Sequence, residues 1–326
     1  MQTSMSIREY PEVSMINNRT RTLSRRQFMR GVGLLSAGII LMPENIFAEN
    51  SQPVTRAIPS TGERIPVIGM GTSRTFDAGN DPAARAELRQ VLQVFFDNGG
   101  ALIDSSPMYG SSEMVVGDLL KTIHNKQKLF AATKVWIDGK QNGIDQMQAS
   151  MRLMGVATMD LMQIHNLRDW KSHLPTLREW KQEGRIRYIG ITTSHGRYHA
   201  ELMQIMRTED LDFVQFTYNI GNRTVEDGLL PLAADRGMAT LINRPFQRGG
   251  LFGKVKGKAL PEWAGEFDCK SWGQFFLKFA VSHPAVTCVI PATSKVQHMA
   301  DNMAANFGKL PSPSMRKRMI EYFTSL

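Results

Sequence analysis

Four side chains with acid–base chemistry are spaced along the first half of the sequence. Asp104, Lys134 and His165 each lie at the end of a short apolar segment, and Tyr109 follows Asp104 by five residues in a loop that contains proline and glycine. A free tyrosine, with a pKa of about 10, donates a proton poorly at neutral pH. A neighbouring lysine ammonium favours the phenolate and would make Tyr109 a better acid. These residue types together predict a site that protonates an oxygen atom.

Protonation of an oxygen is one half of a carbonyl reduction, in which a nicotinamide cofactor delivers a hydride to the carbonyl carbon. In such a site Tyr109 would supply the proton and Asp104 would pair with Lys134. His165 would hydrogen-bond the substrate oxygen and orient it. Taken singly, each residue has an ordinary structural explanation, such as a helix cap, a surface ion pair or a hydrogen-bonded core imidazole. Convergence of all four on one place is what favours the catalytic interpretation.

To bring these residues together, the fold must place the ends of several segments at one rim. Short apolar runs recur through the chain, and helical periodicity fills the gaps between them. Apolar runs without in–out alternation are typical of buried parallel strands. Side chains at three- and four-residue spacing predict helices around 88–96, 272–279 and 296–307. We expect strands at 67–71, 101–105, 129–134, 160–165, 188–193, 212–216, 239–244 and 287–291.

Eight strand–helix units over about 250 residues match an α/β fold of the (β/α)8 type, the TIM barrel. A doubly wound sheet would more usually have about six strands and a glycine-rich first turn. No GxGxxG follows any of the expected strands. We therefore predict a single barrel domain over residues 49–326. The active sites of such barrels lie at the C-terminal ends of the strands, where the acid–base residues fall.

Several motifs, in order along the chain, resemble those of the aldo-keto reductase family. The segment GGALIDSSPMYGSSEMVVGDLL is similar to the Asp-to-Tyr motif of that family, FAATKV to its lysine strand and MDLMQIH to its histidine strand. EGRIRYIGIT, DFVQFTYN and IPATSKVQHMADN resemble later blocks. The resemblance covers about residues 57–310. It implies a (β/α)8 barrel and NAD(P)(H)-dependent reduction of aldehydes or ketones to alcohols, or the reverse reaction. The catalytic tetrad that it implies is Asp104, Tyr109, Lys134 and His165.

The same resemblance implies a set of cofactor-binding residues. Those at the ends of the first, fifth, sixth and seventh strands would surround the nicotinamide and the pyrophosphate, and those before the last barrel helix would meet the adenosine. The full set is Gly71, Thr72, Thr192, Thr193, Gln215, Asn243, Arg244, Pro245, Phe246, Ser294, Lys295, His298, Asp301 and Asn302.

Three positions depart from the family pattern. Two threonines end the fifth strand where a Ser-Asn pair is usual, which alters the contact with the nicotinamide carboxamide. Asn243 replaces the tyrosine that stacks on the nicotinamide ring, a role that Phe246 could take. His298 replaces the arginine that commonly grips the 2′-phosphate of the adenosine. Because Lys295 can still meet a phosphate as a point charge, we expect NADP(H) rather than NAD(H).

The N-terminal segment LSRRQFMRGVGLLSAGIILMPENIFA resembles a twin-arginine export signal. Arg25 and Arg26 precede an apolar run, residues 31–42, that is shorter than the roughly 20 residues a membrane span requires. A small-residue site near Ala48 predicts cleavage there. We expect residues 1–48 to be a signal peptide, the twin-arginine translocase to be a partner, and the protein to be periplasmic. An uncleaved membrane anchor is the alternative.

The charge distribution argues against a nucleic-acid partner. The formal net charge is +9, of which +3 falls in residues 1–48, and the other charges are scattered apart from a small basic cluster at 316–318. Scattered charge is typical of an ordinary solvated surface. His195 and His199 have the spacing of two ligands on a helix, but no HExxH motif, carboxylate or cysteine pair supports them, so we expect no metal. The two cysteines of the chain allow at most one disulfide.

Other functions stay open on the sequence alone. A barrel of this kind could bind NADP(H) as a redox-sensing or regulatory subunit with little turnover, and such subunits can retain the tetrad. A hydrolytic barrel such as a glycosidase needs paired carboxylates flanking the bond, and no two strand ends offer them. An exported enzyme would also need a redox partner or second substrate to recycle a tightly held cofactor. Substrate choice depends on loops, chiefly the loop at residues 245–270. This loop either covers the cofactor or is an ordered surface excursion.

Overall fold

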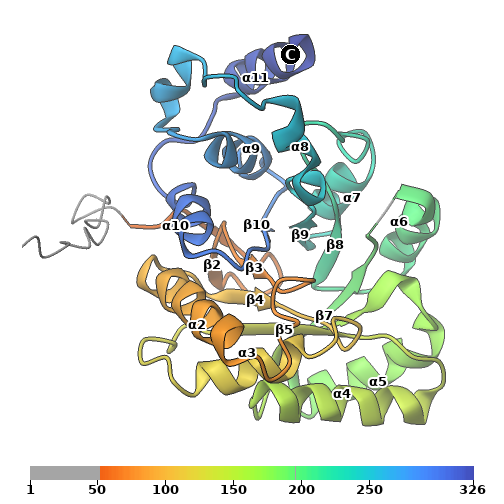
Figure 1. Ribbon diagram of the computed structural model, residues 1–326. Coiled ribbons are helices and arrows are strands. Elements are labelled where there is room, and N and C mark those ends of the chain that lie inside the picture. The colour runs from red at the N-terminus through yellow and green to blue at the C-terminus, as the bar shows by residue number, and fades with distance from the viewer. Residues whose placement is uncertain (1–51, 195) are drawn as a thin grey trace, which may run out of the picture. The chain divides into compact units, whose positions relative to one another are not determined.

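The computed structural model describes residues 52–194 and 196–326. These residues form an α/β barrel in which eight parallel strands are ringed by helices (Figure 1). The strands follow one another round the sheet in chain order, so each strand pairs with the strand that precedes or follows it in sequence. This confirms the predicted (β/α)8 architecture. The predicted signal peptide, residues 1–48, lies outside the described residues.

Every barrel strand overlaps one of the eight apolar segments that predict strands. The strands of the barrel are β3 (Met70–Gly71), β4 (Leu102–Asp104), β5 (Phe130–Val135), β6 (Met159–Ile164), β7 (Ile186–Thr192), β8 (Phe213–Thr217), β9 (Ala239–Asn243) and β10 (Cys288–Val289). A separate antiparallel hairpin precedes them, made of β1 (Thr55–Ala57) and β2 (Arg64–Pro66).

At least one helix follows each barrel strand, and a further helix, α11, ends the chain. The helices are α2 (Pro82–Asp97), α3 (Ser112–Leu120), α4 (Lys140–Met154), α5 (Trp170–Gln182), α6 (His199–Thr208), α7 (Leu229–Asp235), α8 (Gly250–Lys254), α9 (Trp272–Val281), α10 (Val296–Ala304) and α11 (Pro313–Ser325). Short 3-10 turns are η1 (His165–Leu167), η2 (Gly196–Tyr198), η3 (Gln247–Gly249) and η4 (Glu262–Phe267). The helices expected from periodicity correspond to α2, α9 and α10.

The barrel closes where its first and last strands meet. Parallel bridges join Ile68 to Val289 and Gly71 to Ala292. A Cβ on Gly69 would lie 3.1 Å from Cys288 Sγ across this seam and 2.9 Å from the carbonyl oxygen of Leu102 in β4 on the other side. Glycine is therefore required at position 69 by close packing against both neighbours.

The interior of the barrel is apolar near the N-terminal ends of its strands. Because side chains alternate along a strand, every second residue points inward. Phe130, Tyr188 and Phe213 form an aromatic layer with ring centroids 5.5–6.0 Å apart. The hairpin adds Ile58 and Ile65 to the same buried cluster and so closes the N-terminal end of the barrel. The polar residues at the C-terminal ends of the strands therefore lie above a layer of buried apolar side chains.

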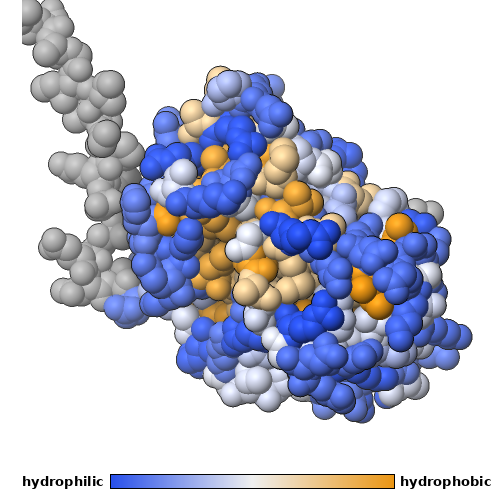
Figure 2. Space-filling view, turned by 90° about the horizontal axis from the view of Figure 1, so that it is seen from below, coloured by the Kyte–Doolittle hydropathy of each residue, from blue (hydrophilic) through white to orange (hydrophobic). Residues whose placement is uncertain are grey.

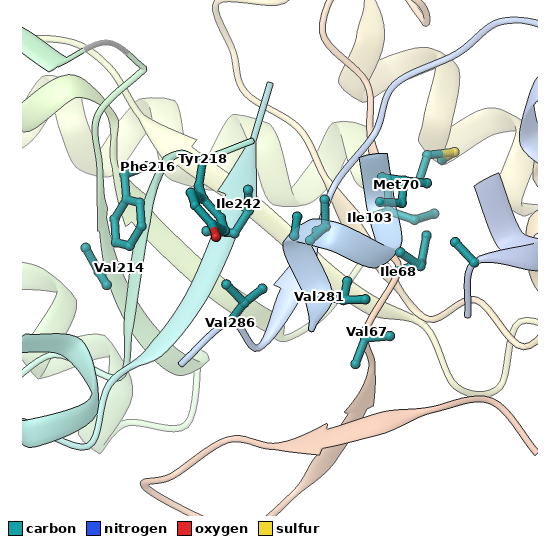
Figure 3. Close-up of a cluster of buried hydrophobic side chains, with 14 of the residues drawn as sticks. Val67, Ile68, Met70, Ile103, Val214, Phe216, Tyr218, Ile242, Val281 and Val286 are labelled. Atoms are coloured by element: carbon teal, nitrogen blue, oxygen red, sulfur yellow. The ribbon is translucent and has the colours of Figure 1, made fainter. Parts of the chain in front are cut away.

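The outward-facing residues of the strands pack against the helices. Figure 3 shows Ile103, Val214 and Ile242 from the strands in one cluster with Val281 of α9. All four side chains are fully buried. Burial of an aliphatic side chain of this size stabilises a fold by about 1.5–3 kcal/mol. This layer holds the strand ends, and with them the polar residues, at fixed positions.

Hydrophilic side chains cover most of the face seen in Figure 2, with hydrophobic ones gathered near its middle.

Cys269 and Cys288 are both buried free thiols, so the disulfide that the sequence allows is not formed. Within residues 52–194 and 196–326, no helix has the length and hydrophobicity needed to cross a membrane.

Candidate active site

The four predicted acid–base residues lie together at the C-terminal ends of the barrel strands. Asp104 is the last residue of β4, Lys134 is the penultimate residue of β5, and His165 directly follows β6. Tyr109 lies in the turn between β4 and α3. Three of them line a pocket of about 650 Å³, and Lys134 is fully buried beneath it. The parallel register explains the convergence, because strand ends that carry inward-pointing residues meet at one rim.

Lys134 and Asp104 form a buried ion pair. The Lys134 Nζ donates to Asp104 Oδ2 at 2.6 Å and to the Ser105 carbonyl at 2.6 Å. Burial tends to lower the pKa of Lys134, but the charge of the Asp104 carboxylate and its hydrogen bond to Nζ outweigh burial, so the pKa of this ammonium lies above its usual value. Lys134 is therefore charged, with its Nζ 5.2 Å from the centroid of the Tyr109 ring.

The Tyr109 side chain is half-buried, and the acidity of its phenol reflects two opposing effects. Burial raises its pKa above the ordinary value of 10.0, whereas the charge of Lys134 lowers it in part. The sequence predicts the lysine effect but not the larger one from burial, so the phenol is a weaker acid than expected from its neighbour alone. It is thus fully protonated at neutral pH, as a proton donor must be at the start of a reduction.

His165 is a neutral imidazole at the edge of the pocket. Burial, reinforced by the charge of Lys134, lowers the pKa of His165 to about 2. Its ring is almost perpendicular to that of Tyr109, with centroids 5.9 Å apart. Its Nδ1 lies 3.0 Å from the Ser106 hydroxyl oxygen. A neutral imidazole here can donate a hydrogen bond to a substrate oxygen without carrying a charge.

Two buried glutamines complete the surroundings of Asp104. Gln163 Nε2 donates to Asp104 Oδ1 at 2.9 Å, and Gln215 Nε2 donates to the same oxygen at 3.1 Å. Sequence reasoning missed Gln163, although its position two residues before His165 gives it the same inward orientation on β6. Gln215 was expected among the residues that surround the nicotinamide and the pyrophosphate. Its nitrogen is engaged by Asp104, and its amide oxygen accepts from Asn243 Nδ2 at 3.4 Å, so both ends of this amide have partners in the pocket wall.

Eight of the predicted cofactor residues line the same pocket as the acid–base residues. They are Gly71, Thr72, Thr192, Gln215, Asn243, Arg244, Pro245 and Phe246. Asn243, in the place of the expected ring-stacking residue, accepts from the Thr217 hydroxyl at 2.6 Å and donates to the Thr193 carbonyl at 3.0 Å. Thr193 is thus a buried neighbour of the pocket wall.

The residues that were predicted to meet the adenosine are not among those that line this pocket. They are Ser294, Lys295, His298, Asp301 and Asn302. Lys295 Nζ pairs with both carboxylate oxygens of Glu87 at 3.0 Å. Asp301 accepts from Ser271 Oγ at 2.6 Å and from Gln274 Nε2 at 2.7 Å, which ties α10 to the start of α9. Asp301 therefore has a structural role that the sequence did not predict.

Three arginines line the pocket: Arg74 in the loop after β3, and Arg244 and Arg248 after β9. Within the described part of the chain, none of the three guanidinium groups has an ion pair or hydrogen bond. All three have left-handed backbones, with φ of 64°, 50° and 58°. Such conformations cost about 1–3 kcal/mol outside glycine and cluster at binding sites. Burial, followed by the charge of Arg248 and then that of Arg74, lowers the pKa of Arg244.

These arginines fit a phosphate-bearing ligand, because guanidinium groups bind phosphate oxygens through paired hydrogen bonds. A cavity of about 650 Å³ is also within the range of small-molecule and cofactor sites. Arg74 carried no signal in the sequence that sets it apart from any surface arginine. Its role emerges only from its position opposite the β9 loop.

The long loop 245–270 divides into two parts. Of its first residues, Pro245, Phe246, Arg248 and Gly249 contribute to the pocket wall. Beyond them, Phe252 packs on Phe276 with centroids 5.6 Å apart, and Trp263 packs on Phe275 at 5.9 Å. Most of the loop is therefore an ordered excursion over α9.

Comparison with known proteins agrees with this geometry. The profile of the Aldo/keto reductase family matches residues 67–318. The methylglyoxal reductase YeaE of Escherichia coli is 27% identical over 248 residues, which cover 74% of this chain and 85% of that protein. An NADH-specific methylglyoxal reductase of the same organism is 28% identical over 233 residues, covering 60% of this chain and 68% of that one.

Solved structures share the fold. An aldo-keto reductase of Klebsiella pneumoniae in complex with NADPH superposes with a TM-score of 0.68 at 22% sequence identity, covering 83% of this chain and 95% of that one. The family profile spans the barrel and includes all four acid–base residues. The chain therefore belongs to the aldo/keto reductase family of oxidoreductases.

Proposed function

We propose that the protein reduces aldehydes or ketones to alcohols with NADP(H), using Tyr109 as the general acid. The observation that carries this proposal is the position of the Tyr109 phenol beside the buried Lys134–Asp104 pair, with His165 on the same pocket wall. When bound, the nicotinamide supplies the hydride. The protein orients the carbonyl, donates the proton from Tyr109 and stabilises the resulting phenolate with the Lys134 charge.

The proposed cofactor site uses two sides of the pocket, the side with the three arginines and the side with the ends of β7 to β9. Arg74, Arg244 and Arg248 would meet the phosphates that join the two nucleosides, and the polar ends of β7 to β9 would face the nicotinamide. Phe246 lines the pocket and is the aromatic residue available to contact the ring. Ser294, Lys295, His298, Asp301 and Asn302 would then lie toward the adenosine.

Preference for NADP(H) over NAD(H) is assigned to Lys295. Substitution Lys295→Ala should weaken NADPH binding about tenfold and leave NADH binding nearly unchanged, because only NADPH carries a 2′-phosphate. That figure is the low end for a charge-assisted hydrogen bond, since Nζ is well exposed and screened by solvent. Dissociation constants from the quenching of protein fluorescence measure both cofactors.

Glu87 offers a matched control, because it holds the same ammonium. Glu87→Gln should release Lys295 Nζ and tighten NADPH binding without changing NADH binding. Equal losses for NADPH and NADH in Lys295→Ala would exclude a 2′-phosphate contact at this residue. An NADH-specific relative shows that this family also holds the opposite preference.

The proposed substrates are small carbonyl compounds. Two relatives are methylglyoxal reductases, so 2-oxoaldehydes such as methylglyoxal are the first compounds to test. Steady turnover of a panel of aldehydes and ketones with NADPH, followed at the absorbance of the reduced nicotinamide, tests the proposal. Tight nucleotide binding with no turnover of any carbonyl would instead favour the redox-sensing or regulatory subunit.

The protein is proposed to reach the periplasm through the twin-arginine translocase. The paired change Arg25→Lys/Arg26→Lys should leave the protein in the cytoplasmic fraction, because that translocase reads the two arginines. Arg30→Lys, which also keeps its charge, should be exported normally and is the matched control. Fractionation with immunodetection measures both, and export of the double variant at the wild-type level would contradict the proposed route.

A protein exported in folded form could carry its nucleotide with it. Retention for hours requires an off-rate of about 10⁻⁴ s⁻¹, which with association near 10⁶ M⁻¹s⁻¹ corresponds to a Kd of roughly 0.1 nM. A cofactor held so tightly would be recycled in place by a second substrate or a redox partner. Mass spectrometry of protein recovered from the periplasm tests this, since empty protein would contradict loaded export.

A further inference from the structure

The hydroxyl of Ser106 lies against the inner nitrogen of His165. Ser106 Oγ is 3.0 Å from His165 Nδ1, and both residues are buried. The backbone N–H of Met108 donates to the same hydroxyl oxygen at 3.3 Å. The serine is held by the turn that carries Tyr109, so it links the proposed acid to the imidazole beside it.

These two contacts decide which ring nitrogen carries the proton. A hydroxyl has one proton to donate, and that of Ser106 has no acceptor in residues 52–194 and 196–326 other than His165 Nδ1. If Nδ1 itself carried the proton, the Ser106 hydroxyl would be a buried donor without a partner. An unsatisfied donor of this kind disfavours a state by about 5- to 150-fold. The favoured arrangement is therefore Ser106 O–H donating to Nδ1, with the ring proton on Nε2.

We propose that Ser106 is a positioning residue that fixes neutral His165 as the Nε2–H tautomer. His165 lines the pocket, and its Nε2 has no hydrogen-bond partner within the described residues. The tautomer makes Nε2 a donor to a carbonyl oxygen. The opposite tautomer would make Nε2 an acceptor, which cannot orient a carbonyl in this way. This inference rests on the proposed carbonyl reduction for its catalytic meaning, but the tautomer itself does not depend on it.

Nitrogen NMR of the full protein labelled at histidine reads the tautomer directly. The seven histidines are assigned with the help of His165→Gln, which removes one set of signals. We expect the wild type to show His165 with a protonated Nε2 and an unprotonated Nδ1 at pH 7. In Ser106→Ala these two signals should move toward each other as both tautomers become populated. An unchanged tautomer in Ser106→Ala, or a wild type protonated at Nδ1, would overturn the proposal.

Ser112→Ala is the matched control for the NMR experiment. Ser112 is buried in the same segment, but its hydroxyl donates to the Tyr109 carbonyl at 2.7 Å rather than to the imidazole. The His165 nitrogen signals should therefore be the same in Ser112→Ala as in the wild type. Ser106→Thr keeps a hydroxyl and should restore the wild-type His165 signals.

Kinetics separate positioning from a general structural effect. Ser106→Ala should lower kcat for carbonyl reduction by about 2- to 13-fold, the range for one net hydrogen bond, with the Kd for NADPH unchanged. Glutamine has no tautomers, so Ser106→Ala should have no further effect on kcat in a His165→Gln background. An equal loss in both backgrounds would mean that Ser106 acts through something other than His165.

Failure of the proposed function would look different. If the wild type turns over no carbonyl substrate, the reductase assignment fails while the NMR result for Ser106 still stands or falls on its own. If the wild type is active and Ser106→Ala keeps both its kcat and its tautomer, the reductase assignment stands and only the positioning role of Ser106 is lost.

Discussion

Tyr109→Phe should lower the rate of carbonyl reduction by about 10²–10⁴-fold, the usual contribution of a general acid. The phenol is the proposed proton donor, and phenylalanine keeps the ring against His165 while removing the proton. The fold and the Kd for NADPH should be unchanged, because the hydroxyl is assigned no part in nucleotide binding. Single-turnover reduction by the preformed NADPH complex measures the chemical step.

The pH dependence of the wild type gives a second reading of the same group. Burial raises the pKa of the Tyr109 phenol above its ordinary value, so the phenol keeps its proton as the pH rises toward 10. Reduction should therefore be lost only above about pH 10, and Tyr109→Phe should lack this loss. Tyr322→Phe, in α11, is a control that should retain the wild-type rate. Full activity of Tyr109→Phe would remove Tyr109 from the mechanism.

Lys134→Met should both abolish reduction and destabilise the fold by about 3–5 kcal/mol. Removal of one partner from a buried ion pair leaves the other as an uncompensated buried charge. Asp104 is 2% exposed and would keep only its glutamine contacts. Denaturation by urea measures the free energy of unfolding, and single-turnover reduction measures the catalytic loss.

The double variant Lys134→Met/Asp104→Asn separates the two effects. With no buried carboxylate, the free energy of unfolding should recover most of the loss, whereas the rate of reduction should stay low because the phenolate has no charge to stabilise it. Recovery of activity together with stability would mean that Lys134 serves only the fold. A stable and fully active single variant would contradict both assignments.

The sequence predicted structure best where the residues of a single segment are enough to identify its role. Apolar runs predicted the barrel strands, and the spacing of Asp104, Tyr109, Lys134 and His165 predicted a shared rim because parallel strands end on one side of a barrel. The contact between Lys295 and Glu87, 208 residues apart, has no such local signature. The structural use of Asp301 escaped prediction for the same reason.

The effect of burial on a side chain's pKa was harder to predict than the effect of a neighbouring charge. The sequence identifies Lys134 as a charge that lowers the pKa of Tyr109, but it gives no measure of how much water the fold removes from the phenol. Desolvation is the larger effect and has the opposite sign. The pairing of Ser106 with His165 likewise depends on the turn geometry after β4, which residue types alone do not specify.

The seam that closes the barrel also bears on how the chain is made. The backbone N–H of Ile68 donates to Asn306 Oδ1, 238 residues later. At roughly 5–20 residues per second, a ribosome needs on the order of 10–50 s to add that length of chain. The first strand can pair with β4 early, but its neighbour across the seam, β10, is not synthesised until most of the chain has been translated, and such distant pairings also fold slowly. The Arg25–Arg26 pair is synthesised long before the seam can form. A route that threads unfolded chains could begin during that wait, whereas a route for folded proteins would receive the barrel only after it had closed.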